Sequence, residues 1–440
     1  MAGAEVARPS REEIRRLVEP NRVHRAIYVD PAIFAVEIER IFERSWIYVG
    51  HESQLPKRGD YITAQIGRQP VIMVRHDDGS IRILYNRCGH RGARLVVEAG
   101  NLRHFRCCYH GWTFRTDGTV LSVPLRRGYD GTAFDSSDPA FSIPRVARVD
   151  SYQGFVFASL AAQGPDLRTF LGGIASSLDD MVDRAPGGRI EIAGRPFRFI
   201  LRSNWKLFLE NLNDTMHALS VHESAIESAH TQLDRMSDPE TPEHSWVGDT
   251  LSTIGKNGTP QATMDQIGVA GFPNGHSLMG GFFNPDSYER PYVAALEQAY
   301  GTERMREILS VNRHNSIVYP SVTVQAAFHQ LRVIRPLAVD RTLVEAYTFR
   351  LIGAPAESYR RTLAYAMLMN TPSSNMMPDD LEALYRVQEG LTVAASDWVS
   401  LHRNAGHDAA ESGSISGTGT SELPMRNQSR AWLDLMTAQD

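Results

Sequence analysis

The chain contains little cysteine, little lysine and no long apolar segment. Only three of its 440 residues are cysteine, and this low, odd number argues against a disulfide framework. No apolar run reaches the length of a membrane span, and residues 1–19 lack an apolar signal core, so we expect a cytoplasmic protein without a membrane partner. Only three residues are lysine, and the arginines are scattered among acids. The formal net charge of −5 therefore disfavours binding to nucleic acid.

The distribution of apolar residues divides the chain into parts of different character. Apolar residues at helical spacing in 11–19 and 31–45 predict N-terminal helices within 1–45. From residue 46 onward, short runs rich in Val, Ile, Tyr and Phe alternate with glycine turns, which predicts a small all-β domain at 46–163. The pattern in 164–440 mixes helices and strands and predicts an α+β domain with one antiparallel sheet and helices packed on it.

Individual elements can be assigned within this division. In the all-β domain we expect strands at 70–75, 80–86, 105–108 and 154–158. In the α+β domain we expect a helix at about 204–222, strands near 315–323, 326–335 and 342–352, and helices at about 356–369 and 379–391. The Gly/Ser/Thr-rich run 412–420 predicts a flexible loop.

All three cysteines fall in one short segment that also contains histidine. Cys88-Gly-His90 is followed, after 16 residues, by Cys107-Cys108-Tyr-His110. Two thiolates and two imidazoles can hold a binuclear iron centre in which cysteine binds one iron and histidine the other. A Cys₂His₂ zinc site and two chance pairs are the alternatives. Zinc sites more often take a cysteine pair from one loop and a histidine pair from another, whereas each loop here supplies one of each.

A second pair of histidines lies in the segment 203–222. His217 and His222, completed by a distant carboxylate, could form the two-His-one-carboxylate triad of non-haem Fe(II) oxygenases. A spacing of five residues turns about 140° on a regular helix. Both rings can reach one metal only if the helix ends or unwinds, and we expect a break near 219–221. Two histidines on a helix are by themselves a weak motif, because surface or core histidines are common.

Asp214 lies three residues before His217, about 60° away on a helix. It could therefore accept a hydrogen bond from the His217 ring, although a solvated helix acid is the alternative. Phe208, Leu212 and Met216 lie at helical spacing that fits either a substrate pocket or a plain core. No dinucleotide-binding glycine fingerprint is present, so electrons from a nicotinamide would have to come from another protein.

The sequence around these ligands resembles a known family. His-Arg-Gly-Ala at 90–93 and Tyr-His-Gly-Trp-Thr-Phe at 109–114 resemble Rieske [2Fe–2S] domains. Asn-Trp-Lys at 204–206, with the histidine pair that follows, resembles the catalytic domain of aromatic-ring-hydroxylating Rieske oxygenases. The resemblance extends over about residues 20–435 and is greatest to the large (alpha) subunits of benzoate and salicylate hydroxylases. It implies an all-β Rieske domain beside a helix-grip catalytic domain that includes residues 1–45.

The resemblance also implies which residues bind the cluster. Cys88 and Cys107 would bind one iron of the [2Fe–2S] cluster, and His90 and His110 the other. Cys108 stands where such domains usually carry proline, which points to a packed side chain and not to a ligand.

For the mononuclear Fe(II), the family places the third ligand at the start of a C-terminal helix. Met-Pro-Asp-Asp-Leu-Glu at 377–382 resembles that place. We therefore expect His217, His222 and Asp380 as ligands, with Asp379 and Asp397 as rivals for the carboxylate. The acids at 379 and 380 also suit a helix N-terminus, and the two roles are compatible.

The implied function is that of a terminal oxygenase component. Electrons from NAD(P)H would arrive through a reductase, with or without a ferredoxin, and O₂ would be used to hydroxylate a small, carboxylated aromatic substrate. A homotrimer or an α₃β₃ assembly with a small β subunit is expected, in which Asp214 bridges His217 and the His110 of a neighbouring subunit. The runner-up is a Rieske O- or N-demethylase, and a non-catalytic electron carrier is a different class. Mono- and dioxygenation both remain open.

Overall fold

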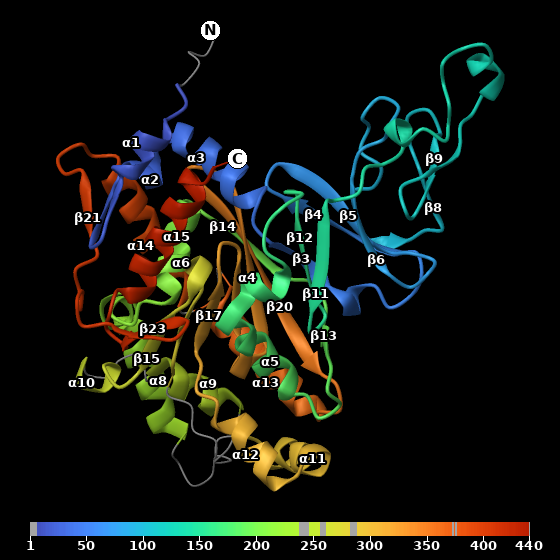
Figure 1. Ribbon diagram of the computed structural model, residues 1–440. Helices are drawn as coiled ribbons and strands as arrows, with labels where there is room; N and C mark the ends of the chain where they lie inside the picture. The colour runs from blue at the N-terminus through green and yellow to red at the C-terminus, as the bar shows by residue number, and fades with distance from the viewer. Residues whose placement is uncertain are drawn as a thin grey trace. The chain divides into compact units, whose positions relative to one another are not determined.

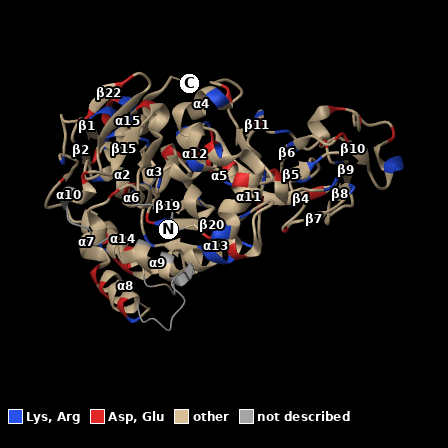
Figure 2. Cartoon of the chain, turned by 90° about the horizontal axis from the view of Figure 1, so that it is seen from below, with Lys and Arg blue, Asp and Glu red and all other residues tan. Residues whose placement is uncertain are grey.

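The computed structural model describes residues 7–236, 246–255, 261–281, 288–371, 374 and 376–439. Contacts between residues divide the chain into two compact units (Figure 1). The smaller unit is Ile38–Leu167, and the larger unit combines Met1–Glu37 with Arg168–Asp440. Acidic and basic residues are interspersed along the chain (Figure 2). In the part of the chain that the structure describes, no helix has the length and apolar character needed to cross a membrane.

The smaller unit is built from short antiparallel strands. One sheet has the order β11-β12-β3, a second has the order β6-β5-β4-β7, and a third has the order β10-β9-β8. The strand bounds are β3 Ile47–His51, β4 Asp60–Ile66, β5 Gln69–Arg75, β6 Ile81–Tyr85, β7 Gly100–Asn101, β8 His104–Arg106, β9 Thr113–Arg115, β10 Val120–Ser122, β11 Arg148–Tyr152 and β12 Phe155–Ser159. The four strands expected in this region correspond to β5, β6, β8 and β12, but β8 ends at Arg106 because a tight loop begins at the next residue.

The larger unit contains a long antiparallel sheet, and its described strands have the order β13-β20-β19-β18-β17-β16-β15-β23-β22, with β14 also pairing with β20. Their bounds are β13 Ile190–Ile192, β14 Phe197–Leu201, β15 Gly268–Gly271, β16 Ser277–Met279, β17 Asn315–Val318, β18 Val322–Gln325, β19 Gln330–Ala338, β20 Arg341–Leu351, β22 Ala409–Glu411 and β23 Ser414–Thr418. A small separate sheet joins β1 Val18–Glu19, β2 Arg22–His24 and β21 Trp398–Ser400.

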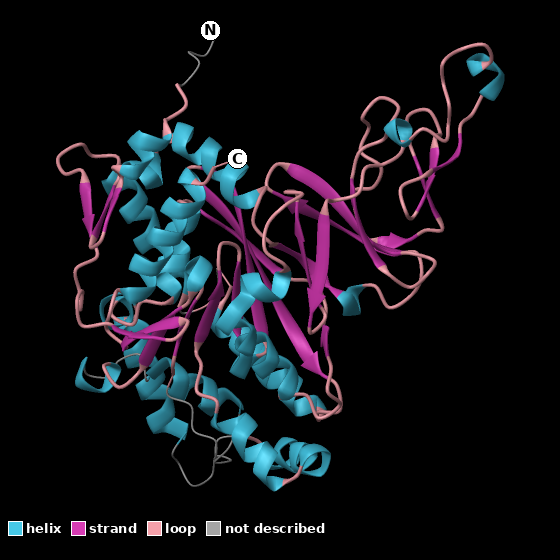
Figure 3. Cartoon of the chain, in the orientation of Figure 1, coloured by secondary structure: helices cyan, strands magenta, loops and turns pink. Residues whose placement is uncertain are grey.

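Helices flank this sheet (Figure 3). α15 contacts β15 and β16, α6 contacts β19, and α13 contacts β20. The described helices are α1 Arg11–Arg15, α2 Ala26–Val29, α3 Pro31–Glu37, α4 Leu167–Leu171, α5 Ala175–Asp183, α6 Trp205–Leu212, α7 His217–Val221, α8 Glu223–Met236, α9 Trp246–Gly255, α10 Gln261–Met264, α11 Arg290–Tyr300, α12 Thr302–Ser310, α13 Ala356–Met369, α14 Met377–Leu391 and α15 Leu423–Thr437. The α+β class expected from the sequence is confirmed.

The segment that carries the histidine pair differs from its expected form. A single helix was expected over 204–222, but α6 ends at Leu212 and α7 begins only at His217. The break expected near 219–221 is confirmed, because α7 ends at Val221 and His222 lies outside the helix. A further break, which was not expected, lies at 213–216, where Asp214 Oδ1 accepts the Met216 amide at 2.9 Å. Side chains of this type compete with the helical hydrogen bonds of the backbone.

Other boundaries also shift. The run 412–420, expected to be a flexible loop, contains strand β23, which pairs with β15 and β22. Its small residues fit a strand because the sheet on both sides supplies the hydrogen bonds. The strand expected at 315–323 is interrupted by a turn with a cis Tyr319–Pro320 peptide, and the strand expected at 326–335 begins only at Gln330.

A buried ion pair joins the N-terminal helices to the rest of the larger unit. Glu37 of α3 is completely buried, and its carboxylate lies 2.5 Å from the Lys206 ammonium of α6. The same carboxylate accepts the indole N–H of Trp205 at 2.9 Å and that of Trp432, from α15, at 2.7 Å. Three helices that are distant in sequence therefore meet at the Glu37 carboxylate. Each contact with this carboxylate offsets part of the free-energy cost of burying its charge.

We expect Lys206→Met to lower the free energy of unfolding by about 3–5 kcal/mol, because it leaves the Glu37 carboxylate buried without its cation. Urea denaturation followed by circular dichroism measures this change. The control is Arg386→Met, which removes an exposed i,i+4 ion pair with Glu382 and should leave the midpoint unchanged. A Lys206→Met protein with the wild-type midpoint would show that the ion pair does not hold these helices together.

Candidate metal centres

Two loops of the smaller unit share one pattern of backbone hydrogen bonds. In residues 88–93 the amide of the first residue donates to the carbonyl of the last at 2.8 Å, and the amide of the fifth donates to the carbonyl of the first at 3.0 Å. In residues 107–112 the same two bonds measure 2.8 and 3.1 Å. The fifth residue is Gly92 in one loop and Gly111 in the other, with φ of 75° and 69°. This left-handed conformation favours glycine, so the sequence specifies both turns.

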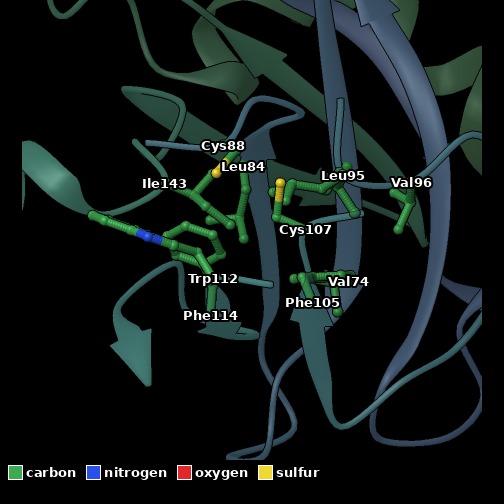
Figure 4. Close-up of a cluster of buried hydrophobic side chains, with 11 residues drawn as sticks. Val74, Leu84, Cys88, Leu95, Val96, Phe105, Cys107, Trp112, Phe114 and Ile143 are labelled. Atoms are coloured by element: carbon green, nitrogen blue, oxygen red, sulfur yellow. The ribbon is translucent and has the colours of Figure 1, made fainter. Parts of the chain in front are cut away.

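Each loop begins with a buried cysteine. Cys88 and Cys107 are 1% and 4% exposed and belong to an apolar cluster with Leu84, Phe105 and Ile143 (Figure 4). Burial raises the pKa of the Cys88 thiol. A thiolate at this position therefore requires a cationic partner such as a metal. Cys108, by contrast, is exposed, so the packed position expected for its side chain is wrong.

The histidines of the two loops lie beside each other. The ring centroids of His90 and His110 are 4.7 Å apart, and both side chains are partly exposed. The Trp112 indole stacks on His90 at 4.9 Å with an interplanar angle of 2°, so it shields one face of that ring. The Nδ1 atom of His90 is buried and has no hydrogen-bond partner among the described residues. Two buried thiols with two adjacent imidazoles, one of them with an unpaired ring nitrogen, fit the donor set of a Rieske cluster.

In the larger unit, the structure brings together the three residues expected at a mononuclear metal. One ligand atom from each of His217, His222 and Asp380 lies within 4.8 Å of the other two. His217 begins α7, His222 lies directly after its last residue, and Asp380 is in the first turn of α14. Asp380 Oδ1 is 3.3 Å from His222 Nε2 and 3.7 Å from His217 Nε2. Because α7 ends at Val221, His222 lies outside the helix. Its ring can therefore lie near that of His217, although the two residues are five positions apart.

The donor set fits a metal and not a closed hydrogen-bond network. The Nδ1 atoms of both histidines are buried without a hydrogen-bond partner in the described residues. Burial by itself lowers the pKa of His222, but the hydrogen bond and the charge of Asp380 outweigh it, so the net shift of that pKa is upward. Two imidazoles facing one carboxylate are the ligands of a two-His-one-carboxylate iron site.

The rival carboxylates occupy other places. Asp379 Oδ2 lies 3.5 Å from His222 Nδ1, near enough for an ion pair but without hydrogen-bond geometry. Asp397 pairs with Arg25 at 3.2 Å and does not belong to the triad. Asp380 Oδ1 also accepts a hydrogen bond from Asn211 Nδ2 at 3.2 Å. Asn211 therefore orients the carboxylate, a role that the sequence motif alone did not reveal.

Asp214 lies beside this site but does not contact His217 as expected. Its Oδ1 accepts the Met216 amide and the Arg403 Nη2 group, both at 2.9 Å. The Nδ1 atom of His217 has no partner. The angle of about 60° assumed a continuous helix, whereas Asp214 lies in the break between α6 and α7, where its side chain turns towards Arg403. The expected hydrogen bond between Asp214 and His217 is therefore absent from this structure.

A cavity of about 110 Å³ adjoins the triad. Of the three residues expected in a pocket, Leu212 lines it. Phe208 and Met216 do not, which corrects those two predictions. Phe208 is fully buried and packs against Phe199 of β14, with ring centroids 6.4 Å apart. Met216 lies in the break after α6, so the helical spacing that grouped it with Leu212 does not apply.

Apolar and polar side chains both line the cavity. The apolar and aromatic lining residues include Leu212, Ala218, Met264, Ile267, Met279, Tyr365 and Met369. The polar lining residues outside the triad include Asn211, Asp214, His314, Asn315, Gln325, Arg332 and Asn370. Burial lowers the pKa of His314 to about 4, so its ring is neutral at pH 7, and burial lowers the pKa of Arg332 to about 10, so its guanidinium stays charged. Sequence reasoning did not single out either residue.

Comparison with known proteins places these sites in a family. Residues 45–153 match the model of the Rieske [2Fe–2S] domain, and residues 179–438 match that of the catalytic domain of the ring-hydroxylating alpha subunit. The alpha subunit of toluate 1,2-dioxygenase from Pseudomonas putida is 34% identical over 398 residues, which cover 88% of this chain and 82% of that protein. The alpha subunit of N,N-dimethyl phenylurea N-demethylase from a Sphingobium species is 38% identical over 210 residues, covering 47% of this chain and 45% of that protein.

Solved structures agree with the sequence comparison. Naphthalene 1,2-dioxygenase from a Rhodococcus species, bound to indole, is 25% identical with a TM-score of 0.78, and the match covers 95% of each chain. The fold and the two sites thus define an iron-dependent oxidoreductase. The chain belongs to the Rieske ring-hydroxylating oxygenases, as an alpha subunit that hydroxylates aromatic substrates. Its cofactors are a [2Fe–2S] cluster and a mononuclear iron, and NAD(P)H supplies electrons through a reductase. The resemblance inferred from the motifs is confirmed.

Proposed function

We propose that this chain is the terminal oxygenase component of a system that hydroxylates a carboxylated aromatic compound with O₂. The observation that carries the proposal is the grouping of His217, His222 and Asp380 in the lining of a cavity that also has apolar walls. A chain that served only as an electron carrier would need neither the triad nor the cavity. Toluate is an aromatic acid. The similarity to the alpha subunit of toluate 1,2-dioxygenase therefore supports a carboxylated substrate.

For the two groups we propose the ligands that the motifs predict. Cys88 and Cys107 would bind one iron of the cluster, and His90 and His110 the other. His217, His222 and Asp380 would bind the mononuclear iron. When bound, the cluster supplies single-electron transfer and the ferrous iron supplies a binding position for O₂.

The surrounding residues have structural tasks in this proposal. Asn211 holds Asp380 by the hydrogen bond to Oδ1 and so fixes the orientation of that ligand. The apolar cluster around Cys88 and Cys107 excludes water from the thiolates, and Trp112 covers one face of His90. The apolar walls of the cavity keep water from the substrate ring.

We also propose partners for the chain. A reductase, with or without a ferredoxin, would deliver electrons, and a head-to-tail homotrimer or an α₃β₃ assembly would bring a neighbour's cluster to this chain's iron. Asp214 would link His217 to the His110 of the neighbouring subunit. Its pairing with Arg403 at 2.9 Å would then open or be shared on assembly. The related proteins are named as alpha subunits, which supports a multi-subunit system.

One observation favours a second candidate function. The N-demethylase alpha subunit is the more identical of the two relatives, but over less than half of the chain. The same ligands could serve oxidative removal of an N- or O-alkyl group from an aromatic compound. The match over 88% of the chain favours ring hydroxylation.

Product analysis with ¹⁸O₂ distinguishes these functions. The purified oxygenase, a surrogate reductase and NADH are supplied with benzoate, ring-substituted benzoates, and N-methyl and O-methyl aromatic compounds. We expect ¹⁸O in a ring-hydroxylated product of an aromatic acid, and the number of labelled atoms separates monooxygenation from dioxygenation. Dealkylated products alone would overturn the proposal in favour of the demethylase. Absence of substrate-dependent O₂ uptake would point to the electron carrier.

A further inference from the structure

Arg332 places a positive charge in the wall of the cavity beside the iron triad. It lies on β19, where it pairs with Thr323 of β18 on one side and Ala346 of β20 on the other. The residue is only 4% exposed and lines the cavity together with His217, His222 and Asp380. Because β19 pairs with a strand on each side, the backbone that carries Arg332 is held in place.

The guanidinium is incompletely paired. Its Nη2 group donates to Asn315 Oδ1 at 3.2 Å, but its Nε is buried without an acceptor. Within the residues that the structure describes, no carboxylate forms an ion pair with Arg332. Two other buried arginines have one, since Arg184 lies 3.0 Å from Asp180 and Arg426 lies 2.6 Å from Asp408. Because an unpaired buried charge is costly, a cation kept in this state is suited to an anion that arrives from outside.

The orientation of Arg332 is fixed before any ligand binds. Asn315 accepts from Arg332 with its carbonyl oxygen and donates with its amide nitrogen to the Leu212 carbonyl at 2.7 Å. That carbonyl is at the end of α6, next to the segment that leads to the first iron-ligand histidine. A guanidinium held in this way can offer parallel N–H groups to a carboxylate, which is a strong and directional contact.

The rest of the cavity suits the ring of the same ligand. Leu212, Ile267 and Met279 supply apolar walls. The cavity volume of about 110 Å³ is of the same order as the roughly 150 Å³ of an apolar cavity that holds a benzene ring.

His314 also lines the cavity but is neutral, so Arg332 is the cation among the described residues that line the cavity. Asp214 also lines the cavity, but its carboxylate pairs with Arg403 at 2.9 Å. Arg332 therefore offers a positive charge without an ion pair, beside apolar walls, to a ligand with one negative charge and an aromatic ring.

We infer that Arg332 binds the carboxylate of an aromatic-acid substrate and thereby sets which ring carbons face the iron ligands. This inference rests on the proposed function, because it names the substrate class of that site. Arg332 acts as a substrate-binding residue, and Asn315 as the positioning residue that holds it. A neutral aromatic compound of the same shape fits the walls but leaves the guanidinium unpaired.

Equilibrium binding to the iron-loaded oxygenase tests the inference. Isothermal titration measures the Kd of benzoate and of benzamide, its neutral isostere, for the wild type, Arg332→Met and Arg332→Gln, and circular dichroism verifies folding. We expect the benzoate Kd to rise about 100-fold in both variants, because a buried bidentate contact is lost. The benzamide Kd should change by less than about threefold. Arg335→Met is the matched control, because Arg335 is on the same strand, pairs with Glu345 at 2.6 Å, and does not line the cavity.

Three results would overturn the inference. The first is a benzoate Kd that stays at the wild-type value in Arg332→Met and Arg332→Gln. The second is an equal loss of benzoate and benzamide binding, which would indicate a purely structural role. The third is a wild type that hydroxylates a neutral ring but does not bind benzoate. This third result would leave ring hydroxylation intact, whereas the proposed function fails separately if the ¹⁸O₂ experiment yields dealkylated products alone.

Discussion

Replacement of His217 by alanine is expected to lower substrate turnover by more than about 100-fold while the [2Fe–2S] chromophore remains. Loss of an outer partner of a metal ligand typically costs 10–100-fold in affinity or activity, so loss of a ligand should cost more. The remaining ligands, His222 and Asp380, leave an incomplete triad. The steady-state rate measures turnover, the iron content per chain measures occupancy of the mononuclear site, and the visible absorbance measures the [2Fe–2S] cluster. Iron content should fall by the mononuclear iron alone, because the cluster ligands lie on other elements.

The matched control for this variant is His230→Ala. His230 is an exposed histidine of α8, beyond the triad, and is expected to be dispensable for iron content and turnover. A His217→Ala protein that keeps full turnover would contradict the assignment of the triad. Loss of the cluster in both His217→Ala and His230→Ala would show that the substitutions affect folding and not the mononuclear site alone.

The cluster ligands could be predicted from sequence because each loop is a short continuous segment. Residues 88–93 and 107–112 contain both the ligands and the glycines that shape the turns, so the local motif includes the geometry. The mononuclear site is only partly local. His217 and His222 are close in sequence, but Asp380 comes from a distant helix, and only the family resemblance pointed to it.

The interior of the catalytic unit could not be predicted in the same way. Arg332 is one of many arginines, and its place in the cavity depends on the pairing of β18, β19 and β20. The additional helix break at 213–216 had a signal in the sequence, because Asn213 and Asp214 are residues that interrupt helices. Hydrophobic spacing suggested one long helix and concealed that signal. The strand in 412–420 has a composition typical of loops, and only its neighbours in the sheet make it a strand.

The second prediction concerns the two adjacent cysteines, of which the structure favours one as a cluster ligand. Cys107 is 4% exposed, belongs to the apolar cluster that includes Cys88, and begins the second hydrogen-bonded loop. Cys108 is exposed. Because the two residues are neighbours with the same chemistry, Cys108→Ala is a close control for Cys107→Ala. Any difference between the variants reports on the position of the thiol and not on the presence of cysteine in this segment.

We expect Cys107→Ala to lose the cluster completely, together with its visible absorbance, its acid-labile sulfide and all turnover, because three ligands cannot hold both irons of the centre. Cys108→Ala should keep full sulfide content and turnover. If Cys108→Ala lost its sulfide and Cys107→Ala kept it, Cys108 and not Cys107 would be the cluster ligand. Purified wild type with zinc in place of iron and sulfide would contradict the cluster itself, since each loop would then contribute to a Cys₂His₂ zinc site. The buried position of Cys107 and the two matching loops favour the first outcome.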